Sequence, residues 1–444
     1  MLPRKLGVLL AAVPLVAVLL ADGALLAHRS TPTNDGGRPS TTNAPRASRA
    51  LNDGAQVRAA ALRSLLARRS DAVLHHNRAE WLGTLDPRHR AFRRQQAQTF
   101  ANLRAVPLAS WSYSFDSSEA QSPNHATSRY HAPVWAPTTF ALHYRLRGFD
   151  TRPTNLAQFP TFLQRHGTWY LTSFSDFAGD GQTSARELWD FGPVVVVRRP
   201  HVLVLGHPGE EASMQLIADE AVADIPRVTA VWGTRWARRV VVLVPSTQHE
   251  LSQVVDDYGD LDHIAAVATA EVQTHPGHPD PVGDRVGINP DNWPKLSPLG
   301  RRIVLTHELT HVATRSVTGA AMPTWLAEGF ADYVGYLGSG IPTSFAAQEL
   351  AADVRAGHVP SSLPSDNQFD GDNKHLSQAY EGAWLACRLI AERGQSALVR
   401  FYRAVGSSSS SQDDAIASAS TRVLHESFQR FTRQWRDFLR AELA

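Results

Sequence analysis

The chain has 444 residues, of which 43% are hydrophobic and 19% charged, a composition typical of a globular protein with two or three domains. Its 44 basic and 42 acidic side chains nearly balance, at a net charge of +2, and no dense basic stripe with interleaved aromatic residues is present, which argues against a nucleic-acid partner. The single cysteine, Cys387, excludes an intrachain disulfide. Because it lies in a helical apolar pattern, we expect a buried thiol.

The first 27 residues have the pattern of an export signal. A pair of basic residues precedes an apolar run from Leu6 to Ala21, and this order predicts that the rest of the chain is extracytoplasmic. The run is long for a signal-peptide core and short for a spanning helix, so two outcomes stay open: a cleaved, secreted protein, or a membrane anchor formed by residues 6–27. Residues 28–50 are rich in Ser, Thr, Pro, Asn and Gly and predict a disordered linker.

Residues 51–180 predict an α+β domain. Helical spacing of Ala, Leu and Arg covers residues 57–85, and a second helix is expected over 90–103. Helices followed by an antiparallel sheet are an α+β arrangement. Together with the hairpin signal at 167–170, this order resembles NTF2-like cone-shaped domains, and we expect a structural or protein-docking role rather than catalysis. The strand-like runs are 111–115, 140–146, 161–162 and 169–174.

A second domain is predicted over residues 188–444, with a small sheet followed by a mostly helical part. Apolar runs at 201–206 and 240–245 have strand length and are separated by a helix from about 210 to 224. Residues 286–289 predict an edge strand that lies along a substrate cleft and pairs with an extended peptide. Further expected elements are a strand at 194–197, helices around 384–390, 398–405 and 428–439, and a serine-rich loop at 406–412.

Positions 307–311 spell HELTH, an HExxH pattern. Ser297 and Pro298 supply an N-cap and a first-turn proline, so a helix is predicted to begin just upstream. On a helix, side chains at i and i+4 share one face, so His307 and His311 can bind one ion with Glu308 beside it. Zinc with one open position lowers the pKa of a bound water, and a nearby carboxylate can take the proton, which is hydrolytic chemistry.

A third ligand is expected from the next helix. Gly319 and Pro323 predict a helix stop and a turn after His311. Glu328 follows His311 with sixteen residues between them, enough to start a second helix that packs beside the first. Asp332 lies one turn beyond Glu328 on the same face and is a candidate to orient one of the histidines through its second ring nitrogen. The alternative is that both carboxylates are solvated helix charges.

The HELTH motif followed by WLAEGFADY at 325–333 resembles the gluzincin zinc metallopeptidases. The resemblance implies that His307, His311 and Glu328 bind one Zn²⁺ ion and that Glu308 is the general base. Asp332 matches the aspartate behind the metal ligands of thermolysin-like members. The likeness extends in general character to bacterial exported proteins described as peptidase MA-like.

The segment AYEGAW at 379–384 is similar to the Y-E-K-G segment of aminopeptidase N-like gluzincins. Tyr380 matches the tyrosine that stabilises the oxyanion, and a phenol donor near developing negative charge is physically reasonable. The lysine of that segment is absent, and so is the G-x-M-E-N segment that holds a substrate's amino terminus. The resemblance to aminopeptidases therefore concerns the metal site and not the specificity.

These observations predict an α+β protein with an NTF2-like domain followed by a mostly helical gluzincin domain with a small sheet. The predicted function is hydrolysis of peptide or protein substrates by an exported or membrane-tethered zinc metallopeptidase, in which Glu308 activates a zinc-bound water. The alternative is an exported zinc-binding interaction module without peptidase activity, which would need neither Glu308 nor Tyr380. Membrane contact is expected only through the N-terminal segment, and another protein could dock on residues 51–180.

Overall fold

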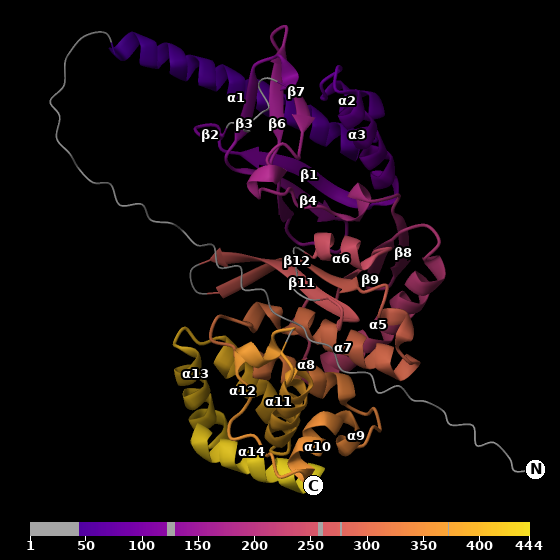
Figure 1. The fold of residues 1–444 in the computed structure, drawn as a ribbon, viewed down its shortest axis with the longest axis vertical. Coiled ribbons are helices and arrows are strands. Elements are labelled where there is room, and N and C mark those ends of the chain that lie inside the picture. Colours follow the sequence, from indigo (N-terminus) through magenta and orange to yellow (C-terminus); the bar gives the residue numbers. More distant parts are fainter. Residues whose placement is uncertain (1–43, 122–128, 256–260, 276–277, 372) are drawn as a thin grey trace, which may run out of the picture. The chain divides into compact units, whose positions relative to one another are not determined.

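The computed structural model describes residues 44–121, 129–255, 261–275, 278–371 and 373–444. Contacts divide the chain into two compact units, whose described parts are residues 44–196 (the N-terminal unit) and 197–444 (the C-terminal unit) (Figure 1). The predicted export signal, residues 1–27, lies outside the described residues, as does the predicted linker up to residue 43. In the described ranges, no helix combines the length and apolarity needed to cross a membrane.

The helices of the N-terminal unit differ from the prediction at two places. Helix α1 (Ala44–Leu74) begins inside the predicted linker, so residues 44–50 are helical rather than disordered. The predicted helix 57–85 is two helices, because His76 has a left-handed φ of 54° and Asn77 caps a new helix, α2 (Arg78–Gly83), by accepting a hydrogen bond from the Glu80 N–H. Helix α3 (Arg90–Asn102) is confirmed.

Two antiparallel sheets complete the N-terminal unit, in the predicted order of helices followed by strands. One sheet has the order β1-β4-β5 and the other β2-β3-β6-β7. The predicted hairpin joins β6 and β7 through His166 and Gly167, whose φ values of 49° and 80° define a two-residue turn that matches the twist of paired strands. Leucines of α1 form a core with strand residues such as Phe162. The strands are β1 (Leu108–Phe115), β2 (Ala120–Gln121), β3 (Val134–Pro137), β4 (Phe140–Leu146), β5 (Thr154–Ala157), β6 (Thr161–Arg165) and β7 (Thr168–Ser173).

The C-terminal unit contains a five-stranded sheet in the order β11-β12-β10-β9-β8. The predicted edge strand at 286–289 is wrong: it belongs to β12, where Val286 pairs with Ala268 on one side and Val242 on the other. The edge strand next to β12 is β11, which was not predicted. Gly287 suits the interior position because a Cβ there would lie 2.7 Å from a methyl group of Leu251. The strands are β8 (Val195–Arg199), β9 (Val202–Gly206), β10 (Val240–Val244), β11 (Ala266–His275) and β12 (His278–Ile288).

Helices make up the rest of this unit. Helix α5 runs past the predicted end at 224 because its apolar stripe stays buried as far as Trp232. The elements are α5 (Glu211–Trp232), α6 (Gln248–Val254), α7 (Pro298–Thr314), α8 (Thr324–Tyr336), α9 (Thr343–Ala346), α10 (Gln348–Arg355), α11 (Leu376–Ala391), α12 (Gln395–Gly406), α13 (Gln412–Ala419) and α14 (Phe428–Leu443).

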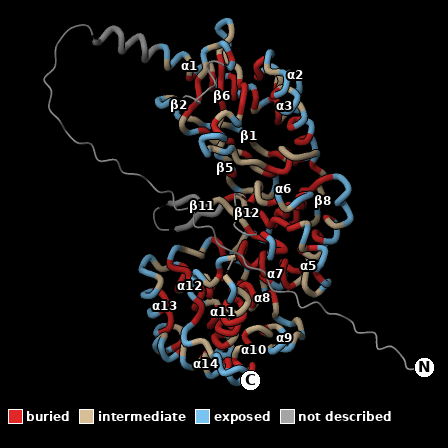
Figure 2. The backbone as a smooth tube through the Cα atoms, viewed as in Figure 1, coloured by how far each residue is buried: buried red, intermediate tan, exposed pale blue. Residues whose placement is uncertain are grey.

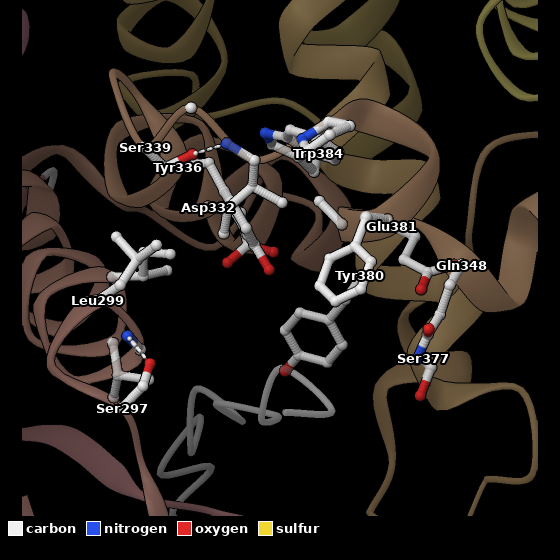
Figure 3. A pocket seen from close by; sticks show the side chains of 18 of the residues that line it. Ser297, Leu299, Asp332, Tyr336, Ser339, Gln348, Ser377, Tyr380, Glu381 and Trp384 are labelled. Atoms are coloured by element: carbon white, nitrogen blue, oxygen red, sulfur yellow. Dashed lines mark hydrogen bonds between the residues drawn. The ribbon is translucent and has the colours of Figure 1, made fainter. Parts of the chain in front are cut away.

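Helices α7, α8 and α11 form the buried centre of the unit, as Figure 2 shows. The predicted start of α7 is confirmed: Ser297 Oγ accepts a hydrogen bond of 3.1 Å from the Gly300 N–H, and Pro298 follows the cap. Cys387 on α11 is buried, as predicted. Residues of all three helices also line a cavity of about 390 Å³, into which the close-up of Figure 3 looks.

Candidate metal centre

Helix α7 places both histidines of the HExxH pattern in the protein interior. Every residue from Ile303 to Thr314 is buried, so this stretch is a core helix rather than an amphipathic surface helix. His307 and His311 lie one turn apart on the same face, and their Nε2 atoms are 3.0 Å from each other. Two imidazole nitrogens that converge in this way are suited to sharing one cation.

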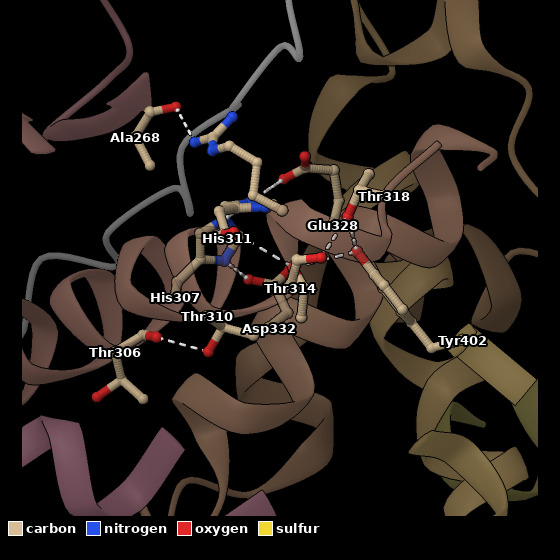
Figure 4. Close-up of polar contacts among 11 residues, drawn as sticks. Ala268, Thr306, His307, Thr310, His311, Thr314, Thr318, Glu328, Asp332 and Tyr402 are labelled. Atoms are coloured by element: carbon tan, nitrogen blue, oxygen red, sulfur yellow. Dashed lines mark hydrogen bonds and ion pairs between the residues drawn. The ribbon is translucent and has the colours of Figure 1, made fainter. Parts of the chain in front are cut away.

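Glu328 on α8 completes the group. Its Oε2 atom lies 3.3 Å from His307 Nε2 and 3.4 Å from His311 Nε2 (Figure 4). The side chain is fully buried, and neither carboxylate oxygen has a hydrogen-bond donor. A buried carboxylate without donors is costly unless a cation balances it. Among the described residues, these three form the group of His, Cys, Asp or Glu side chains whose ligand atoms lie close enough together to hold a metal ion.

The geometry of the three ligand atoms fits zinc. For a tetrahedral ion with bonds of about 2.0–2.2 Å, neighbouring ligand atoms lie about 3.3–3.6 Å apart. The two histidine-to-glutamate distances, 3.3 and 3.4 Å, fall in this range, and the Nε2–Nε2 distance of 3.0 Å is slightly shorter. Two imidazoles and one carboxylate are also a donor set that zinc takes with a fourth position open.

Asp332, one turn after Glu328 on α8, contacts His307 from behind. Its Oδ1 atom lies 2.7 Å from His307 Nδ1, which assigns the ring N–H to Nδ1 and leaves Nε2 as the free lone pair. Burial disfavours a charged imidazole, but the carboxylates of Asp332 and Glu328 outweigh it and raise the pKa of His307. Burial likewise raises the pKa of Asp332 to about 6, against the opposing effect of His307.

Glu308 lies beside this group on α7 and is 1% exposed. Burial is the main cause that raises its pKa to about 8. Glu328 adds to the rise, whereas His307 and a hydrogen bond with the backbone of Ala268 oppose it. Its Oε2 atom has no hydrogen-bond partner. A carboxyl group in this state can take up and release a proton near neutral pH.

The sequence did not predict that edge strand β11 contacts Glu308, or that an arginine binds the backbone of this strand. Arg315, just after α7, donates a hydrogen bond of 2.9 Å to the Ala268 carbonyl of β11, and its Nε atom lies 2.8 Å from a carboxylate oxygen of Asp284 on β12. The only sequence signal was a basic residue one turn after His311. Tyr402 of α12, also missed, donates a hydrogen bond of 3.2 Å to Thr314 on the same helix as the histidines.

Tyr380 does not belong to the group of three converging ligand residues. It is on α11, is 1% exposed, and packs its ring 5.1 Å from that of Phe369. It shares the lining of the cavity with Asp332. The structure therefore gathers His307, His311 and Glu328 with Glu308 and Asp332 around them. The catalytic role of Tyr380 stays a prediction.

No family model matches the chain, and no curated protein matches it. Similar solved structures include a mutant of a two-domain M1 zinc metallopeptidase bound to L-arginine, with 14% identity and a TM-score of 0.35 over 71% of this chain and 61% of that chain. An M1 zinc metallopeptidase from Deinococcus radiodurans is 16% identical, with a TM-score of 0.36 over 69% of this chain and 60% of that chain. The chain thus spans about three fifths of the length of these structures. At these values the likeness carries no argument for function, which rests on the site itself.

Proposed function

We propose that this protein is a zinc metallopeptidase that hydrolyses peptide bonds. The observation that supports the proposal is the buried set of His307, His311 and Glu328, next to the buried carboxyl group of Glu308, whose Oε2 atom has no hydrogen-bond partner. A zinc ion held by these ligands supplies a Lewis acid and lowers the pKa of a bound water.

The residues around the ligands supply the remaining chemistry. Asp332 accepts the Nδ1–H of His307 and so keeps Nε2 available as a ligand atom. Glu308 is the base that takes a proton from the attacking water onto its carboxylate and later delivers it to the leaving amine. Strand β11 brings its Ala268 backbone to Glu308, so an extended peptide that lies along this edge reaches the reactive groups. Tyr380 is proposed as the donor to the developing oxyanion.

Export and docking complete the proposal. The basic pair followed by an apolar run at residues 6–21 supports an extracytoplasmic protein that is either secreted or anchored by residues 6–27. The N-terminal unit, with its helices followed by antiparallel strands, is proposed to be NTF2-like and to dock another protein. Amino-terminal sequencing of protein from the culture supernatant and from the membrane fraction tests the first point: a start after residue 21 in the supernatant shows cleavage, and protein confined to the cytoplasm contradicts export.

The Glu308→Gln variant tests the hydrolytic mechanism. Glutamine keeps the size and one acceptor oxygen but removes the base, so the variant should hold about one zinc per chain, like the parent, while hydrolysis of a mixed peptide library falls by about 10²–10⁴. Zinc is measured by atomic absorption and cleavage by mass spectrometry. The control is His311→Ala, which should lose both zinc and activity.

Two results would contradict the proposal in different ways. A Glu308→Gln variant that cleaves peptides as fast as the parent would exclude Glu308 as the base. A parent that is fully loaded with zinc and cleaves no peptide would favour the zinc-binding interaction module instead.

A further inference from the structure

A cavity of about 390 Å³ lies next to the metal centre in the C-terminal unit. Asp332, which accepts the hydrogen bond from His307, is also one of its lining residues (Figure 3). Val304, one turn before His307 on α7, lines it too. Pockets that bind small organic groups have volumes of about 300–1,000 Å³, so this space suits one or two side chains rather than a folded partner. A peptide with its scissile bond at the metal centre would therefore have a neighbouring side chain within reach of the cavity.

The walls of the cavity are largely apolar and aromatic. Leu299 and, one turn later, Ile303 and Val304 line it from α7, and Tyr336 and Trp384 line it with their ring centroids 4.9 Å apart. An apolar residue of a ligand would replace water against these walls, which is favourable at about 25 cal/mol per Å² of apolar surface buried.

Phe345 lines the cavity and is 48% exposed. Large hydrophobic side chains with this exposure are few among the residues that the structure describes. An exposed aromatic ring that borders an apolar cavity is typical of a surface that a ligand covers.

The cavity is lined by three acidic residues, Asp332, Glu349 and Glu381, and by no basic one. The N–H groups at the start of α10, which could attract an anion, are already used, because the buried carboxyl group of Glu381 accepts from the N–H groups of Leu350 and Glu349 at 2.6 and 3.3 Å. An acidic side chain would therefore enter without a positive partner, and burying an unpaired charge is costly.

We propose that this cavity is the specificity pocket of the peptidase: it takes a bulky uncharged side chain, aliphatic or aromatic, from a residue adjacent to the cleaved bond, and it rejects acidic side chains. This inference rests on the proposed function and adds a substrate class to it. Binding and cleavage can be measured separately, so the two proposals fail in different ways.

The first experiment measures binding to the zinc-loaded full chain by ligand-observed NMR titration. N-acetyl-phenylalaninamide should bind, and the matching glutamate amide should bind at least about tenfold more weakly. Ala346→Trp fills the cavity from the α9 side and should weaken binding of the phenylalanine amide about tenfold or more. The matched control is Ala352→Trp, which adds the same side chain at an exposed position of α10 that does not line the cavity. If Ala346→Trp does not fold, Ser377→Phe takes its place, because it fills the cavity from the α11 side.

The second experiment measures kcat/KM on peptides in which the residues flanking the cleaved bond are phenylalanine, leucine, alanine or glutamate. Ala346→Trp should lower the value for the phenylalanine and leucine peptides about tenfold or more and leave the alanine peptide within about threefold. Binding of the phenylalanine amide without any cleavage would support the pocket and contradict the peptidase. Cleavage with no preference against glutamate at any position, unchanged in Ala346→Trp and Ser377→Phe, would overturn the pocket and leave the peptidase standing.

Discussion

Glu308 and Glu328 are both buried carboxyl groups, yet their surroundings move their pKa values in opposite directions. Burial raises both, because a carboxylate loses its hydration. Near Glu328 the two imidazoles outweigh burial, and its pKa is lowered. Near Glu308 burial prevails, and its pKa rises to about 8. One carboxyl group thus stays ionised as a ligand, and the other exchanges a proton near neutral pH.

Tyr380 gives a prediction at the scale of one hydroxyl group. If its phenol stabilises the oxyanion, Tyr380→Phe should lower kcat by about 10²–10³ and leave zinc content and Tm nearly unchanged, because the contact is made mainly in the transition state. Turnover, atomic absorption and thermal unfolding are measured on the same preparation. A loss of about 1 kcal/mol of stability with unchanged turnover would instead show that the hydroxyl group only satisfies the protein interior.

At the scale of elements, the metal centre depends on how closely α8 approaches its neighbours. Glu328 is followed by Gly329, where a Cβ atom would lie 2.3 Å from the carbonyl oxygen of Ala383 on α11. Gly335, farther along α8, has a similar contact of 2.9 Å with the carbonyl oxygen of Ile303 on α7. The two glycines let α8 lie between the other two helices with its carboxylates at the histidines.

Gly329→Ala should therefore destabilise the protein by about 1–3 kcal/mol or more, because backbone on α11 cannot give way as a flexible side chain can. It should also weaken zinc binding, since Glu328 moves with the helix. Urea unfolding and zinc titration measure the two effects. Gly300→Ala on α7 is the control: its Cβ would meet neighbours no closer than 3.4 Å, so a change within about 1 kcal/mol is expected. Equal effects of the two substitutions would contradict the packing argument.

The contact between α5 and α7 contains a buried acid. Asp224 on α5 is 1% exposed, and burial raises its pKa from 3.8 to about 7, although Arg227 and a hydrogen bond with Thr306 of α7 oppose the rise. A group whose pKa is higher in the folded state stabilises the fold below its unfolded pKa, and this contribution disappears as the pH rises through the folded pKa. Asp224 should therefore favour the folded state at about pH 4 and lose that effect by about pH 7.

Asp224→Asn should remove this dependence, because the amide stays neutral and can still hydrogen-bond to Thr306. The difference in Tm between variant and parent should grow in favour of the variant as the pH rises from 5 to 8, with a gain on the order of 1 kcal/mol at pH 8. Thermal unfolding across this range checks the slope. A variant that is less stable than the parent at pH 8 would mean that the ionised Asp224 and Arg227 stabilise the fold as a pair.

At the scale of the whole molecule, the metal links the chemistry to stability. Without a cation, the buried carboxylate of Glu328 has only the imidazoles of His307 and His311, at 3.3 and 3.4 Å, to balance it, so binding of zinc to the folded state should raise stability. A chelator should lower Tm by roughly 5–15 °C, and added zinc should restore it. His311→Ala should unfold at the same temperature with and without chelator. An equal shift in that variant would show that the chelator acts elsewhere.

The sequence by itself determined the elements that carry the ligands. Ser297 and Pro298 begin α7 because capping depends only on residues within one turn. His307 and His311 meet because four residues complete about one helical turn, and this holds wherever the helix lies. The hairpin turn at Gly167 is local in the same sense. Glu328 was predicted as the third ligand from its spacing after His311 and from a flanking motif that resembles a known family, and the structure brings it to the two histidines.

Only the tertiary structure decided what surrounds those ligands. Whether β12 is an edge or an interior strand depends on whether another strand covers it, and β11 does so although its small and polar residues gave no strand signal. Arg315 reaches Ala268 across 47 positions of the chain, and the cavity beside Asp332 gathers side chains from segments before and after the metal helix. Periodicity and capping report on neighbours along the chain, whereas these contacts are set by the packing of distant segments.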